Sequence, residues 1–60
     1  MVSPIDIQKS LSGIDFPASK QDIIAHAEGN GADKEVIDAL KKIEDREYEG
    51  PSGVSSAAFS

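Results

Sequence analysis

The chain has 60 residues, no cysteine and a formal net charge of −5 from 11 acidic and 6 basic side chains. This length allows one domain with a small core, and the lack of cysteine excludes disulfides and thiolate metal sites. The charge disfavours binding of the whole surface to nucleic acid or anionic lipid. No basic stretch leads into an apolar run, and no segment approaches the roughly 20 apolar residues that span a bilayer. We therefore expect a cytoplasmic protein without a signal peptide or a membrane segment.

The first predicted helix covers about residues 4–12. Ser3 is a favourable N-cap, and Pro4 falls at the first helical position, where a missing N–H costs nothing. Gly13 is a plausible stop. One face of this helix carries an apolar stripe with spacings of four and three, made of Ile7, Leu11 and Ile14.

The second predicted helix covers about residues 20–28. The preceding Phe16-Pro17 pair predicts extended chain, because a residue before proline is pushed out of the α region. Ser19 is a strong N-cap, and Asp22 three residues later complements the helix dipole. The expected buried face consists of Ile23, Ile24 and Ala27.

The third predicted helix starts at Asp33, which is expected to cap it, and ends near Ile43. Gly29 or Gly31 in the left-handed conformation would end the helix before it. Residues 19–43 then form an αα-corner. The clearest amphipathic face in the chain belongs to this helix and contains Val36, Ile37, Leu40 and Ile43.

A polar turn region follows at residues 44–53, from which Tyr48 is expected to fold back onto the core. Ser52 is a candidate cap for a last short helical turn that carries Val54, Ala57 and Ala58. The predicted fold class is all-α, with three or four short helices around one core. We expect a single domain over residues 1–60, with an ordered part over about 4–54 and a frayed terminus over 55–60.

Several local motifs occur together in this order. They are an aromatic-Pro-Ala-Ser-Lys opening at residues 16–20, two adjacent aliphatics at 23–24, an Asn-Gly-Ala turn at 30–32, an amphipathic helix at 36–40 and an acidic segment ending in Tyr48. Over about residues 5–54 the chain resembles a family of short bacterial proteins known only as domain of unknown function number twenty-seven ninety-five. The chain departs from the family pattern at Glu44, where proline is frequent, and at Gly53, where an acidic residue is frequent. The resemblance implies a compact helical domain and no assigned activity.

His26 is the one side chain whose ordinary pKa lies near neutrality. Asp22 shares its helix face, but a metal site needs three or four ligands, and no second histidine or cysteine exists. Ser10 or Ser19 as a nucleophile would lack a nucleophile elbow, and so small a chain has little room for a ligand pocket. We expect a partly exposed structural histidine that touches Asp22 or Glu28, and we predict no catalytic residue, no cofactor and no metal.

The glycines at residues 29–31 follow a helix and precede Asp33, whose charge would repel phosphate, so a helix C-cap with a tight turn is favoured over a phosphate loop. The acidic residues 44–49 lack the order of an EF-hand loop. They are interpreted as a solvated acidic turn.

The αα-corner also resembles a helix-turn-helix, in which the start of the second helix enters the DNA major groove. Here that start is Asp33, Lys34 and Glu35, which offers little positive charge. The one candidate basic cluster contains Lys41, Lys42 and Arg46, among the acidic residues Glu44, Asp45 and Glu47.

Two function classes remain. The first is a non-enzymatic module that docks on another protein, through an acidic helix face or through apolar residues near the C-terminus. The second is a small nucleic-acid-associated regulator that uses the αα-corner. The second gains if Lys41, Lys42 and Arg46 form one patch clear of carboxylates. The partner's identity and the oligomeric state have no signature in the sequence.

Overall fold

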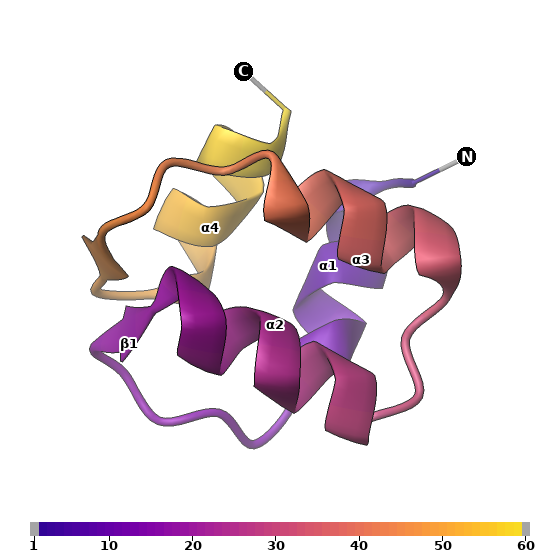
Figure 1. The fold of residues 1–60 in the computed structure, drawn as a ribbon, viewed down its shortest axis with the longest axis horizontal. Coiled ribbons are helices and arrows are strands. Elements are labelled where there is room, and N and C mark those ends of the chain that lie inside the picture. The colour runs from indigo at the N-terminus through magenta and orange to yellow at the C-terminus, as the bar shows by residue number, and fades with distance from the viewer. Residues whose placement is uncertain (1, 60) are drawn as a thin grey trace.

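A computed structural model describes residues 2–59, which form four helices and two strands of two residues each (Figure 1). The elements in chain order are α1 (Pro4–Ser10), β1 (Ala18–Ser19), α2 (Lys20–Gly29), α3 (Lys34–Lys41), β2 (Glu47–Tyr48) and α4 (Pro51–Ala58). The all-α prediction is therefore confirmed, since helices dominate the described chain. α2 packs chiefly on α3, and α1 on α4; in Figure 1 α1 lies behind α3, and the segment after α3 passes in front of α4.

Serine hydroxyl groups cap the N-termini of α1 and α2, as predicted. Ser3 Oγ accepts a bond from the backbone N–H of Asp6 at 3.4 Å, and the Asp6 carboxylate accepts one from the backbone N–H of Ser3 at 3.0 Å. This reciprocal pair is a capping box, which satisfies two N–H groups at the start of α1. Ser19 Oγ accepts a bond from the backbone N–H of Asp22 at 3.2 Å at the start of α2.

The prediction for the cap of α3 is confirmed in the position of the residue but not in its side-chain hydrogen bond. Asp33 occupies the N-cap position with extended backbone angles, but its side chain makes no capping bond. The helix still begins there because Ile37 N–H donates to the Asp33 carbonyl at 3.0 Å and closes the first turn. Gly31, with φ of 74°, is the glycine that takes the left-handed conformation in the turn before it.

Two side chains from the far end of α2 close the C-terminal end of α1. The Asn30 amide donates to the Ser10 carbonyl at 2.9 Å and to the Ser12 carbonyl at 3.1 Å. Nε2 of His26 lies 2.7 Å from the same Ser12 carbonyl and must carry the proton of that bond, because a carbonyl only accepts. The expected contact of His26 with Asp22 or Glu28 is therefore replaced by a bond between elements.

The two strands were not predicted. Ala18 pairs with Tyr48 and Ser19 with Glu47 in an antiparallel register. Phe16 and Pro17, predicted as extended chain, instead form a bend with a cis peptide bond between them. This short pairing ties the start of α2 to the segment that precedes α4.

The core lies between the helices and matches most of the predicted apolar faces. Leu40 and Tyr48 are fully buried, as expected, and the Tyr48 hydroxyl donates to the Glu44 carbonyl at 2.7 Å. Three predicted apolar positions are only half-buried and pack against the core margin: Ile14, Phe16 and Ile24. The buried apolar residues are Ile7, Leu11, Ala18, Ile23, Ala27, Val36, Ile37, Leu40, Ile43, Tyr48 and Val54.

Several helix boundaries differ from the predictions. α1 ends at Ser10 and α3 at Lys41, two residues earlier than predicted in each case, although Ile43 is still buried. The predicted cap at Ser52 is wrong, since α4 starts at Pro51 after Gly50 and has no side-chain cap. Proline sets its own φ for a first helical position, so Pro51 starts the helix without a hydroxyl.

α4 reaches Ala58, the last residue expected on the final helical turn, and residues 55–58 of the segment for which the sequence predicts fraying are helical in the structure. Ser60 lies outside the described residues. Within residues 2–59, none of the helices has the length and apolar character needed to cross a membrane.

Candidate functional site

A surface depression lies between α4 and the segment that follows α3, and we call it the α3–α4 hollow. Its volume of about 580 Å³ lies within the range of ligand sites. Several lining side chains are nevertheless exposed, which makes it an open depression rather than an enclosed pocket. The lining residues are Lys42, Glu44, Arg46, Gly53, Ser56 and Ala57.

Arg46 is held in this hollow by contacts with its neighbours in the chain. The central carbon of its guanidinium lies 4.1 Å from the centroid of the Tyr48 ring, a cation–π distance. Its Nη1 donates to the Glu47 carbonyl at 3.1 Å, and its Nε contacts the Glu44 carboxylate at 3.3 Å. The Arg46 side chain keeps 51% of its surface exposed. The guanidinium is thus fixed in place and still open to a ligand.

Local chain geometry explains how Arg46 reaches this position. The backbone N–H of Arg46 donates to the Glu44 carbonyl at 3.0 Å, which folds the chain into a tight turn after α3. Tyr48 is then buried through β2 and its own bond to the Glu44 carbonyl. The buried ring supplies a rigid platform below the arginine.

The structure brings together two members of the predicted basic cluster. Lys42 and Arg46 line the same hollow, whereas Lys41, at the end of α3, does not line it. The Glu44 carboxylate lies in the hollow and contacts Arg46. The cluster is therefore not clear of carboxylates, which is the arrangement that would have favoured nucleic acid. An interaction role for Lys41, Lys42 and Arg46 stays a prediction.

The residues considered for nucleophilic or acid–base chemistry have structural tasks. Ser19 caps α2, and His26 closes the end of α1 through the Ser12 carbonyl. The Ser10 hydroxyl is buried and donates to the Ile7 carbonyl at 2.7 Å. These bonds hold helix termini together, and none of them joins a nucleophile to a base.

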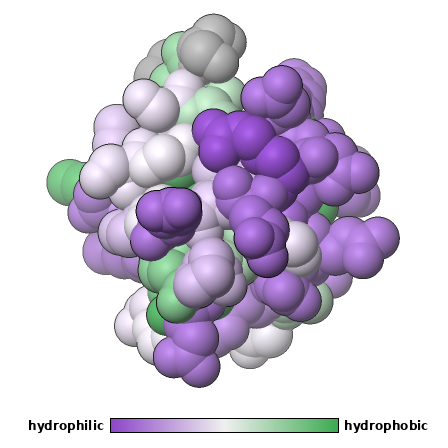
Figure 2. Space-filling model, turned by 90° about the vertical axis from the view of Figure 1, so that its left-hand side faces the viewer, coloured by the Kyte–Doolittle hydropathy of each residue, from purple (hydrophilic) through white to green (hydrophobic). Residues whose placement is uncertain are grey.

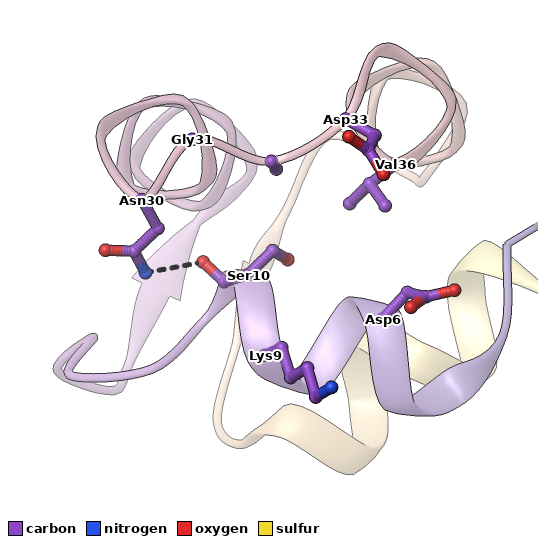
Figure 3. Close-up of a pocket in the computed structure, with 8 residues that line it drawn as sticks. Asp6, Lys9, Ser10, Asn30, Gly31, Asp33 and Val36 are labelled. Atoms are coloured by element: carbon purple, nitrogen blue, oxygen red, sulfur yellow. Dashed lines mark hydrogen bonds between the residues drawn. The ribbon is translucent and has the colours of Figure 1, made fainter.

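A smaller hollow of about 190 Å³ lies between α1 and the turn from α2 to α3 (Figure 3). Asp6 and Lys9 of α1 line one side, and Asn30, whose bond to the Ser10 carbonyl crosses the hollow, lines the other. Bonds from the backbone N–H and then the hydroxyl of Ser3 lower the pKa of Asp6, with a smaller contribution from the charge of Lys9. The Asp6 carboxylate is thus committed to the capping box. The volume is below that of usual ligand sites.

Metal ligation finds no support in the described chain. Residues 2–59 contain no group of three or more histidine, aspartate or glutamate side chains placed to hold an ion.

The exposed first turn of α3 carries Lys34 and Glu35 side by side. This end of the αα-corner therefore presents mixed charge rather than a basic surface.

Comparison with known proteins places the chain in a family. Residues 2–55 match the family described as protein of unknown function (DUF2795), and the chain belongs to that family. The resemblance found in the sequence motifs is therefore confirmed. No curated protein and no solved structure shows a significant match to the chain.

Proposed function

We propose that this member of DUF2795 is a non-enzymatic protein-interaction module that binds an acidic segment of a partner protein in the α3–α4 hollow. The observation that carries the proposal is the guanidinium of Arg46, which is half-exposed yet fixed over the buried Tyr48 ring. Lys42 adds a second cation to the same hollow. On a chain of net charge −5, this is a local surface where an anionic group would meet favourable charge.

Preorganisation supports binding at Arg46. A flexible side chain that is ordered on binding costs about 0.5–1.5 kcal/mol. Arg46 already makes its bond to the Glu47 carbonyl and its stacking contact with Tyr48, so much of this cost is met in the free chain. Its guanidinium carries five N–H groups, and a carboxylate can bind two of them at once.

The Glu44 carboxylate decides which anion fits. Its pair with Arg46 is exposed, with 78% of the Glu44 side chain accessible, and exposed pairs contribute only about 0–1 kcal/mol. An incoming carboxylate can therefore replace Glu44 at small cost. A phosphate backbone needs a row of cations instead, and the adjoining Asp45 and Glu47 are exposed acids. The hollow thus suits one or two carboxylates of a peptide better than a nucleic acid.

The non-enzymatic part of the proposal is supported by the tasks of Ser10, Ser19 and His26, whose polar atoms are engaged at helix ends. A bacterial and cytoplasmic setting is part of the same proposal. The cytoplasmic part is supported by the chain's lack of cysteine, which suits a reducing compartment.

The experiment is site-specific photo-crosslinking in native cells. A photoreactive phenylalanine analogue replaces Asp45, an exposed residue between the lining residues Glu44 and Arg46. The expected result is an adduct with another protein that disappears when Lys42→Glu is added. Lys34→Glu is the matched control, because it makes the same charge change at an exposed lysine of α3 outside the hollow. An adduct that survives Lys42→Glu, or that is lost equally with Lys34→Glu, contradicts the proposal.

A further inference from the structure

The charges of this chain are unevenly distributed. Every acidic and basic residue lies between Asp6 and Glu49, and residues 50–60 carry none. α4, which lies within this neutral stretch, therefore has no charged side chain. Figure 2 views the molecule from the side on which α4 lies in Figure 1. There a pale area, neither strongly hydrophilic nor strongly hydrophobic, adjoins strongly hydrophilic side chains.

A third hollow, of about 380 Å³, runs between α1 and α4. Its lining residues are all uncharged: Pro4, Gln8, Ser52, Ser55, Ser56 and Phe59. Among residues 2–59, Ile5 and Phe59 are the exposed large hydrophobic residues, with 61% and 47% of their surface accessible. Phe59 lines the hollow, and Ile5 adjoins Pro4 and stands one helical turn from Gln8 on α1. We call this hollow together with Ile5 the α1–α4 face.

We propose that the α1–α4 face binds a second copy of this chain in a two-fold symmetric dimer. Two chains of net charge −5 repel each other, so self-association requires a surface on which like charges do not meet. The α1–α4 face meets that requirement, because the hollow is lined by uncharged residues and the charges beside Ile5 on α1, Asp6 and Lys9, are of opposite sign. A two-fold interface brings this same patch of each copy together. The exposed apolar side chains of Ile5 and Phe59 would leave water in the process.

The composition of the face fits such a contact. A stable interface buries about 800 Å² on each partner, about a fifth of the 3853 Å² accessible surface of this chain, so a dimer would bury the hollow together with the residues around it. The exposed side chains of Ser52 and Ser56 stand one helical turn apart on α4 and are small. They allow the facing helices to approach closely, and their hydroxyls donate and accept hydrogen bonds.

This proposal does not depend on the acidic partner at the α3–α4 hollow. Ser56 lines both hollows, but Ile5, Gln8 and Ser52 belong to the α1–α4 face alone. Lys42→Glu is therefore expected to leave self-association unchanged, and a variant of the α1–α4 face is expected to leave the Lys42-dependent adduct in place. Failure of one proposal is thus distinguishable from failure of the other.

The test is sedimentation equilibrium of the full chain over a protein concentration series. The average mass is expected to rise towards that of a dimer below about 1 mM protein. Gln8→Glu is expected to raise the dissociation constant about tenfold, because the new charge meets its own copy across the two-fold axis. Gln21→Glu is the matched control: the same substitution, at an exposed position of α2, is expected to leave the constant within about twofold. Ile5→Glu tests the apolar part of the face and is expected to weaken the dimer in the same direction.

Added salt separates the proposed dimer from a charge-driven one. Screening of the net charge is expected to leave the neutral contact unchanged or to strengthen it. A monomer mass at all concentrations up to about 1 mM overturns the proposal. So does a dimer that salt dissociates, or one that Gln8→Glu and Gln21→Glu weaken equally.

Discussion

Ser19 shows how a single hydroxyl fixes the start of a helix. Its oxygen accepts the backbone N–H of Asp22 at 3.2 Å, and its own backbone pairs with Glu47 across the two short strands. We predict that Ser19→Ala lowers the free energy of unfolding by about 0.5–2 kcal/mol, since one N–H of α2 loses its partner. Denaturant unfolding measures the change. Ser52→Ala is the control, because Ser52 lies inside α4 and caps nothing; equal midpoints for the two variants would contradict the role of Ser19.

The stability that the Asp6 carboxylate contributes at the start of α1 depends on pH. The hydrogen bonds from Ser3 lower the pKa of Asp6 in the folded chain. A carboxyl whose folded pKa lies below its unfolded pKa contributes stability above the unfolded value, and that contribution is lost as pH falls through the folded value. We predict that stability falls on acidification below about pH 4 and that Asp6→Asn flattens this part of the profile. Thermal unfolding from pH 6 to pH 2 measures both; superimposable acid limbs would contradict the capping box.

At the scale of elements, α1 depends on α2 for its C-terminal end. The Asn30 amide donates to the carbonyls of Ser10 and Ser12. We predict that Asn30→Asp costs about 1 kcal/mol or more, because both donors vanish and a carboxylate faces two carbonyl oxygens. Hydrogen exchange of the Leu11 and Ile14 amides, which close the turns after α1, should accelerate. Unchanged exchange there, with global stability intact, would show that the Asn30 bonds do not hold α1.

The contacts at the ends of α1 and α2 show which features of the fold can be predicted from the sequence and which cannot. Local signals predicted the caps at Ser3 and Ser19, because each involves groups three residues apart. The bonds from Asn30 and His26 join residues 14 to 20 positions apart, and no periodicity signals such pairs. The strands were missed for a related reason: two residues are too few to show alternation.

The candidate site could be predicted only in part, because its geometry also depends on contacts that the sequence pattern does not show. Its cations are visible in the sequence, but the tight turn between Glu44 and Arg46 decides which of them meet. That turn, and the burial of Tyr48 below Arg46, brought Lys42 and Arg46 into one hollow with Glu44. Lys41, the last residue of α3, does not line this hollow.

At the scale of the whole molecule, the core leaves little stability in reserve. Proteins gain roughly 0.05–0.15 kcal/mol per residue, so a chain of this length has only about 3–9 kcal/mol. Leu40 is fully buried, and Leu40→Ala is predicted to cost about 2–5 kcal/mol, enough to unfold much of the population. Gln21→Ala, at an exposed position of α2 outside the α1–α4 face, is the control and should change stability by less than about 0.5 kcal/mol. Circular dichroism during thermal unfolding compares the two, and a wild-type melting curve for Leu40→Ala would contradict the assigned core.

The central functional claim is that this acidic domain binds protein and not nucleic acid. The most direct measurement is a paired anisotropy titration at physiological salt, with a labelled glutamate-rich peptide and a labelled mixed-sequence DNA duplex. We predict that the peptide binds and that Lys42→Glu weakens this binding, because its charge meets Lys42 and Arg46 in the α3–α4 hollow. The duplex should not bind, because the start of α3 carries Lys34 beside Glu35 and the hollow contains Glu44. Duplex binding tighter than about 10⁻⁶ M that weakens steeply with added salt would contradict the claim and favour a nucleic-acid regulator.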